Sequence, residues 1–270
     1  MITKTKLRYS SKELSERINA HIQRLAEATD IARMSEEMQA FLNMTARFHA
    51  YSYQNVWLIH ISKPEATIVA GYKKWKSMGR YVRNGEKGIP ILAPILVKPE
   101  DDDGDVDGKL VGFIVIYVFD VSQTDGESLP EPPDWKSPEK NYELGRKLVK
   151  FAKSKGIQVH IKDLEGEIQG ASIGGAIYLS PRAGTKTIIH EIAHELLHKG
   201  ENIVRNKTII ELEAESVAYV VGKYFGLKDL ASPNYVALHG ATAEMIMAHL
   251  ERIRNTAAQI IKAIETENDS

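Results

Sequence analysis

Residues 185–200 read "TKTIIHEIAHELLHKG" and contain two overlapping copies of the pattern H-E-x-x-H. The first copy covers residues 190–194 and the second covers residues 194–198. Apolar residues recur between the charged ones at the spacing of a helix with one buried face. Two histidines four residues apart lie one turn apart on such a helix, so both imidazoles can reach one Zn²⁺ ion. The stretch therefore predicts a helix that carries a metal site.

The two copies differ in how well a helix would hold their histidines. An apolar run precedes the first copy, whereas the second copy ends where glycine closes the helix. A metal site needs rigid ligands, so we assign His190 and His194 as zinc ligands. Glu191 is then the base that takes a proton from water. His198 is interpreted as a residue that interacts with the helix dipole, or as a group at the edge of a pocket.

A third ligand is expected from the next helix, where residues 211–216 read "ELEAES". Glu211 and Glu215 are four residues apart and share a face, whereas Glu213 points to nearly the opposite side. We predict that Glu211 is the third ligand and that Glu215 fixes the tautomer of a ligating histidine. Glu213 stays open as the alternative ligand. Two histidines and one carboxylate leave a coordination position for water, and zinc is the default metal for that set.

The segments "IIHEIAHELLH" and "ELEAESVAYVVGKYFGL" resemble the ImmA/IrrE-type and wider gluzincin metallopeptidases. In these families the third zinc ligand is the first Glu of an E-x-x-A-[DEN] run, which the resemblance places at Glu211. One departure is Glu195, which is charged where zincins usually have an uncharged residue. The implied substrate is a protein or peptide, and the strand "GAIYLS" at residues 175–180 could present an edge to an extended peptide.

Composition limits the class of protein. The chain has 270 residues, 43% of them hydrophobic, which is enough for two globular domains. It contains no cysteine, so disulfides and thiolate metal ligands are excluded. The longest apolar run, at residues 110–119, is too short to span a bilayer. We expect a cytoplasmic protein without a membrane partner.

Charge is distributed unevenly. Residues 1–100 contain 16 basic and 9 acidic residues, whereas residues 101–130 contain 1 basic and 8 acidic residues. The first hundred residues are therefore the part expected to bind a polyanion. Within them, residues 71–89 read "GYKKWKSMGRYVRNGEKGI", in which cations alternate with aromatic rings. Cations that contact phosphates and rings that stack on bases are typical of proteins that bind single strands without sequence preference.

The predicted DNA-binding residues of this segment are Tyr72, Lys73, Lys74, Trp75, Lys76, Arg80, Tyr81, Arg83 and Lys87. The alternative interpretation is a solvated basic helix whose tryptophan packs into the core. Composition alone does not separate the two.

Periodicity and turn residues predict the elements of the fold. Helices are expected at residues 10–28, 35–48, 51–62, 72–78, 141–156, 184–200, 207–226 and 242–265, and strands at 66–71, 89–97, 109–121, 157–163 and 175–180. Residues 124–138 concentrate proline, glycine and acidic residues, as domain linkers do.

Residues 51–95 and 110–131 resemble the N-terminal single-stranded-DNA-binding domain of ArdC-type antirestriction proteins. Members join this domain to a C-terminal zincin domain and occur on mobile elements, where the implied role is to protect incoming DNA from restriction. We therefore predict an α+β protein with an α/β DNA-binding domain at 1–125, a linker at 126–137, and a mostly helical gluzincin-like domain with a small sheet at 138–270. The alternative is an ImmA/IrrE-type regulatory metalloprotease that cleaves a DNA-bound repressor.

Overall fold

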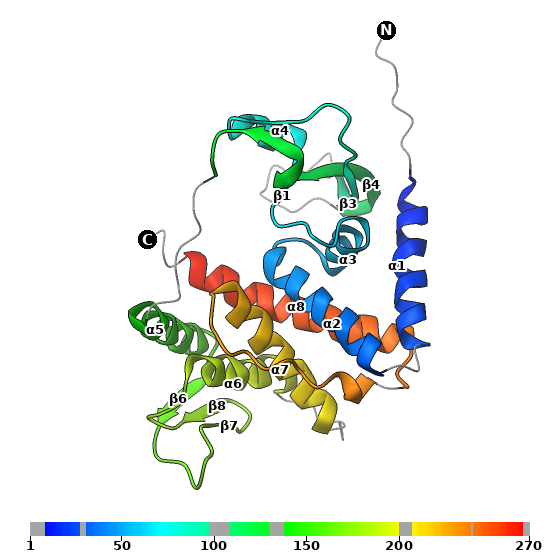
Figure 1. The fold of residues 1–270 in the computed structure, drawn as a ribbon. Helices are drawn as coiled ribbons and strands as arrows, with labels where there is room; N and C mark the ends of the chain where they lie inside the picture. Colours follow the sequence, from blue (N-terminus) through cyan, green and yellow to red (C-terminus); the bar gives the residue numbers. More distant parts are fainter. Residues whose placement is uncertain are drawn as a thin grey trace. The chain divides into compact units, whose positions relative to one another are not determined.

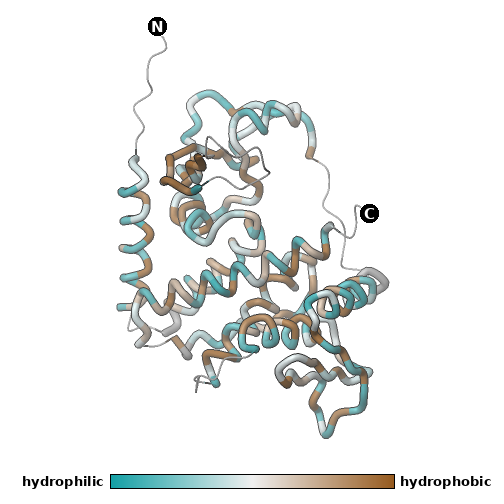
Figure 2. The backbone as a smooth tube through the Cα atoms, turned by 180° about the vertical axis from the view of Figure 1, so that it is seen from behind, coloured by the Kyte–Doolittle hydropathy of each residue, from teal (hydrophilic) through white to brown (hydrophobic). Residues whose placement is uncertain are grey.

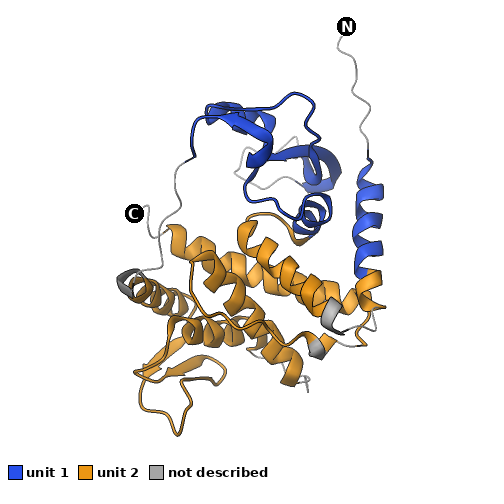
Figure 3. Ribbon diagram, viewed as in Figure 1, with its two compact units in different colours: residues 1–22, 54–130 blue, residues 23–53, 131–270 orange. Residues whose placement is uncertain are grey.

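The computed structural model describes residues 9–27, 31–97, 109–129, 138–199, 207–238 and 240–266. Its mixture of helices and small sheets confirms the α+β class (Figure 1). Contacts divide the chain into two compact units, Met1–Ile22 with Gln54–Pro130 and Gln23–Tyr53 with Glu131–Ser270 (Figure 3). The second unit thus includes residues 23–53, which the predicted division at 125 and 138 assigns to the first domain. That division stays a prediction, and residues 130–137 of the predicted linker lie outside the described residues.

The helices form where the apolar periodicity predicts them. In the first of them, α1 (Ser11–Ala26), the Ser10 side chain accepts from the backbone N–H of Glu13 at 3.2 Å, and the Glu13 carboxylate accepts from the backbone N–H of Ser10 at 2.5 Å. These two bonds form a capping box at the start of α1. Along the long helices, hydrophobic and hydrophilic residues alternate, as expected for elements with one buried face (Figure 2).

The first unit is built around a small antiparallel sheet. Its elements after α1 are α3 (Tyr53–Ser62), β1 (Val69–Gly71), α4 (Tyr72–Ser77), β2 (Arg80–Val82), β3 (Ile89–Val97), β4 (Lys109–Asp120), the 3₁₀ helix η1 (Val121–Gln123) and β5 (Thr124–Gly126). The strands pair in the order β1-β4-β3, and β2 pairs with β5. The Asn55 side chain makes two 2.8 Å hydrogen bonds to the backbone of Leu92, which fixes α3 against β3.

The second unit is mostly helical and carries a three-stranded sheet. Its elements are α2 (Ile31–Arg47), α5 (Pro138–Ser154), β6 (Gln158–Ile161), β7 (Gly170–Ser172), β8 (Ala176–Leu179), α6 (Thr185–His198), α7 (Lys207–Tyr224), the 3₁₀ helix η2 (Tyr235–Leu238) and α8 (Ala243–Thr266). Helix α7 packs against α6, α8 and α2. Ala214 and Ala218 of α7 are fully buried, and their small size allows the close packing of these helices.

The sheet of the second unit differs from the prediction in one respect. Its order is β6-β8-β7, with β6 parallel and β7 antiparallel to β8. The strand at 176–179 is therefore central, and the prediction that it offers an edge to a peptide is wrong. One of its two neighbours is the edge strand β7, which periodicity did not predict because its three residues, Gly-Ala-Ser, include none of the β-branched or aromatic types that favour strands.

Candidate metal centre

Helix α6 positions the histidines. It begins after Gly184, whose extended backbone (φ −75°, ψ 163°) caps the helix without a side-chain hydrogen bond. Its buried apolar residues are Ile188, Ile189, Ile192, Ala193 and Leu197. The spacing of four residues places His190, His194 and His198 along another side, and all three line one pocket.

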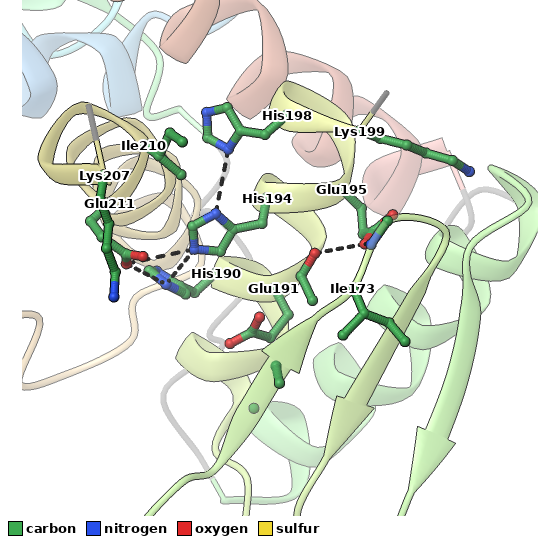
Figure 4. A pocket seen from close by; sticks show the side chains of 14 residues that line it. Ile173, His190, Glu191, His194, Glu195, His198, Lys199, Lys207, Ile210 and Glu211 are labelled. Carbon is green, nitrogen blue, oxygen red and sulfur yellow. Dashed lines mark hydrogen bonds and ion pairs between the residues drawn. The ribbon is translucent and has the colours of Figure 1, made fainter. Parts of the chain in front are cut away.

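Three potential ligand atoms converge beside α6 (Figure 4). His194 Nε2 lies 3.0 Å from His190 Nε2, and Glu211 Oε2 lies 3.5 Å from His190 Nε2 and 3.6 Å from His194 Nε2. Tetrahedral bonds of about 2.0–2.1 Å would hold such atoms about 3.3–3.4 Å apart. The triangle therefore has the size of a zinc-type site, and within the described part of the chain it is the one group of three or more histidine and acidic side chains close enough to hold a metal.

The two histidines are neutral bases in this environment. Burial, followed by the neighbouring His190, lowers the pKa of His194 to about 4. Burial also lowers the pKa of His190, against the opposing charges of Glu211 and Glu215. Because a metal binds only the deprotonated nitrogen, both rings are ready for metal binding at neutral pH.

The three acidic residues of α7 have different positions. Glu211 joins the triangle, whereas Glu213 is fully buried and bonds to His198 and His249 instead. The structure thus brings Glu211, and not Glu213, to the two predicted ligands. Glu215 acts on His190 through its charge, and no hydrogen bond joins these two described side chains. Its predicted role in fixing a tautomer stays a prediction.

Glu191 lies between the triangle and the edge strand β7. Its side chain is buried, and burial together with the charges of Glu211 and Glu195 raises its pKa to about 7. A carboxyl group that titrates near neutral pH can both accept and return a proton. A Cβ atom at Gly170 of β7 would lie 2.7 Å from Glu191 Oε1, so only glycine lets the edge strand approach this closely.

The contacts of Glu195 explain why this position is charged, where the zincin pattern has an uncharged residue. It is buried, and its carboxylate accepts from Ser172 Oγ at 2.6 Å and from the backbone N–H of Gly174 at 2.9 Å. The backbone N–H of Gly175 also donates to it. Both glycines have positive φ, at 75° and 111°, which favours glycine in this turn. The carboxylate of Glu195 therefore anchors the β7–β8 turn to α6.

Sequence reasoning missed two residues near the site, His249 and Arg252 of α8. His249 Nδ1 lies 2.7 Å from Glu213 Oε1, and Arg252 Nε lies 3.7 Å from the same oxygen. One signal was present, because 249 falls between the apolar positions 246, 250 and 253. A histidine within a buried stripe needs a polar partner.

The pocket in front of the triangle has a volume of about 620 Å³. It is lined by residues 170–174 of the β7–β8 hairpin and by residues of α6 and α7, including His190, Glu191 and Glu211.

Among the helices of the described residues, none combines the length and the apolar composition that a membrane span requires.

The predicted DNA-binding residues lie on α4, on β2 and, for Arg83 and Lys87, in the loop between β2 and β3 of the first unit. Tyr72 and Tyr81 are 57% and 59% exposed, and can therefore contact a flat ligand. Trp75 is fully buried, and its Nε1–H donates to the backbone oxygen of Phe119 at 2.8 Å. The prediction that Trp75 stacks on bases is therefore wrong, because the helix turns this ring into the core as its apolar anchor.

The cations of this segment fall into two groups. Arg80 and Arg83 are used within the unit: Arg80 donates to Thr124, and Arg83 pairs with Glu86 at 2.8 Å and with Asp125 at 3.2 Å. The other four are exposed and form no ion pair with any described residue, namely Lys73, Lys74, Lys76 and Lys87. These four lysines and the two exposed tyrosines are open to a ligand, and Arg83 is also exposed although its guanidinium already pairs with two carboxylates.

The chain is similar to known proteins in sequence and in fold. The family model of the N-terminal domain of anti-restriction factor ArdC matches residues 11–154, which is more than half of the chain. An uncharacterized protein of Bacillus anthracis, pXO2-81, is 25% identical over 315 residues that cover 97% of this chain and 52% of that protein. The chain thus spans about half the length of this relative.

Two crystal structures of the antirestriction protein ArdC from plasmid R388 are similar to this chain. The metal-free structure is 18% identical with a TM-score of 0.50, and the match covers 81% of this chain and 85% of that one. The Mn(II)-bound structure is 19% identical with a TM-score of 0.48, covering 84% and 96%. The first match supports a common fold. With the family model matching more than half of its length, the chain belongs to the ArdC family of antirestriction proteins.

Proposed function

We propose that this chain is an antirestriction protein of a mobile element that binds single-stranded DNA and carries a zinc-dependent, metallopeptidase-like centre. The main support for the metal centre is the triangle formed by Nε2 of His190, Nε2 of His194 and Oε2 of Glu211, with sides of 3.0, 3.5 and 3.6 Å. Its two nitrogens and one carboxylate oxygen suit zinc with an open position. Membership of the ArdC family supports the DNA half.

A zinc ion at the triangle would supply Lewis-acid chemistry, polarising a carbonyl oxygen and acidifying water. Glu191 would accept a proton from water and return it to the leaving amine, and its pKa near 7 suits both steps. The strand β7 lines the same pocket at the edge of its sheet, where an extended peptide could add as a further strand. These features favour a peptide as the substrate of the centre.

The exposed lysines of α4 would contact phosphates, and Tyr72 and Tyr81 would stack on bases. A base stacked on an aromatic ring contributes about 1–3 kcal/mol whatever its identity, so binding should depend little on sequence. Each phosphate contact releases counterions, so affinity should fall steeply as salt is added.

Metal analysis tests the first half of the proposal. Purified wild-type protein should contain one divalent ion per chain, and His194→Ala should contain none. His160→Ala is the control, because it removes an exposed histidine of β6 outside the triangle and should keep the ion. Metal retained by His194→Ala would overturn the assigned site.

Fluorescence anisotropy with a labelled oligonucleotide tests the second half. The triple change Lys73→Ala, Lys74→Ala and Lys76→Ala should weaken binding and reduce the slope of log K against log salt by about 0.7 for each lost contact. A matched triple removes the same charge elsewhere, at Lys223, Lys228 and Lys262. Equal losses in both triples would mean that net charge, and not this surface, governs binding.

A regulatory metalloprotease is the second candidate function, favoured by the buried Glu191 beside the peptide-sized pocket. Glu191→Gln distinguishes the two. It should leave metal and DNA binding intact and abolish any proteolysis. Antirestriction that survives this change would assign protection to DNA binding, whereas its loss would assign protection to the protease.

A further inference from the structure

A chain of polar contacts lies behind the metal triangle, on the side of His194 that faces away from Glu211. His194 Nδ1 lies 3.4 Å from His198 Nδ1, and His198 Nε2 lies 2.8 Å from Glu213 Oε2 (Figure 4 shows the first contact). The other oxygen of Glu213 lies 2.7 Å from His249 Nδ1. These contacts link α6 through α7 to α8.

One arrangement of protons gives each of the contacts from His194 to Glu213 one donor and one acceptor when His194 binds a metal through Nε2. The ring must then carry its proton on Nδ1, which donates to the bare Nδ1 of His198. His198 in turn donates from Nε2–H to Glu213. The fully buried carboxylate of Glu213 thereby fixes the tautomer of His198, and His198 fixes that of His194.

Helix α8 holds the far end of this chain. Besides the contact from His249, Arg252 Nε approaches Glu213 Oε1 at 3.7 Å. Arg252 Nη2 also donates to the backbone oxygen of Leu197 at 2.6 Å. Leu197 is in the last turn of α6, where carbonyl groups lack partners within the helix. Arg252 therefore joins both the carboxylate and the end of the metal-site helix.

We propose that His198 and Glu213 are positioning residues that orient His194 for metal binding, and that His249 and Arg252 hold Glu213 in place for this purpose. This inference rests on the proposed metal site. It gives the second H-E-x-x-H copy a function: its last histidine supports a ligand instead of serving as one. The C-terminal helix α8 thereby contributes to metal affinity without touching the metal.

The test measures metal affinity in the full chain, stripped with a chelator and titrated with Zn²⁺ against a chromophoric competitor. His198→Phe keeps a ring but removes both nitrogens, and should weaken Zn²⁺ binding about 10–100-fold. The visible spectrum of the Co²⁺-loaded protein should change with it, since the ligand geometry relaxes. His198→Gln keeps an acceptor and a donor, and should restore part of the affinity.

Glu213→Gln is the second variant and should also weaken binding, so the test does not depend on one variant folding. Ile260→Val is the control, because it removes a methyl group from the buried face of α8 and should lower stability without changing Zn²⁺ affinity. Wild-type affinity and Co²⁺ spectrum in both His198→Phe and Glu213→Gln would overturn the inference, provided that His194→Ala abolishes binding. If His194→Ala still binds Zn²⁺, the proposed site itself fails.

Discussion

Replacing Glu195 by alanine should loosen the hairpin that faces the metal site. The carboxylate accepts three hydrogen bonds, from the Ser172 hydroxyl and from the backbone N–H groups of Gly174 and Gly175. A hydrogen bond to a charged group contributes about 1.5–3 kcal/mol. Water can reach the partly buried donors after truncation, so the loss should be smaller than the sum of three bonds. We expect the free energy of unfolding to fall by about 3 kcal/mol.

Hydrogen exchange gives the local measurement. The amides of Gly174 and Gly175 should lose protection in Glu195→Ala, whereas amides in the middle of α7 should keep it unless the whole unit opens. Urea unfolding of the same protein gives the global loss. Glu195→Gln should be destabilised too, because its NH₂ group would face an N–H donor. Unchanged exchange at both glycines, with unchanged stability, would refute the assigned role of Glu195.

Three further predictions concern single side chains. In metal-free protein, the raised pKa of Glu191 means that the folded state keeps a proton that the unfolded state loses. The free energy of unfolding should therefore fall by roughly 3 kcal/mol as pH rises from about 4.5 to about 7. Urea unfolding across this range should show no such fall in Glu191→Gln, and an equal fall in wild type and variant would contradict the raised pKa. Gly170→Ala should lower the free energy of unfolding by about 1–3 kcal/mol, because the added methyl group would overlap the Glu191 side chain, and should leave metal content unchanged. An unaltered melting temperature would argue against the close contact of β7 with Glu191. Trp75→Phe should reduce the free energy of unfolding by about 1–3 kcal/mol, because the hydrogen bond to the backbone of Phe119 is lost, and should leave DNA affinity unchanged. Weaker DNA binding by a stably folded variant would instead support base stacking by Trp75.

The local elements of this chain were predictable, but their partners were not. The helices at 11–26, 185–198, 207–224 and 243–266 and the strands at 89–97 and 109–120 lie within a few residues of their predicted bounds. Periodicity and caps are local signals, so a single sequence contains them. The buried position of Trp75 depends on which face α4 turns toward β4, and spacing over six residues does not determine that. The edge position of β7 likewise depends on pairing across the sheet.

The geometry of α6 explains why the three histidines of the two overlapping motifs have different partners. Four residues turn an α-helix by about 400°, so each step from 190 to 194 to 198 drifts by about 40° around the axis. His190 and His194 differ by one such step and can share a ligand point with Glu211, as their 3.0 Å separation shows. His198 has drifted by about 80° from His190 and meets Glu213 instead. A third histidine at this spacing therefore suits the support of a ligand better than a place among the ligands. In this chain, H-E-x-x-H-x-x-x-H therefore fits a metal motif followed by a positioning residue, because the buried carboxylate of Glu213 faces its last histidine.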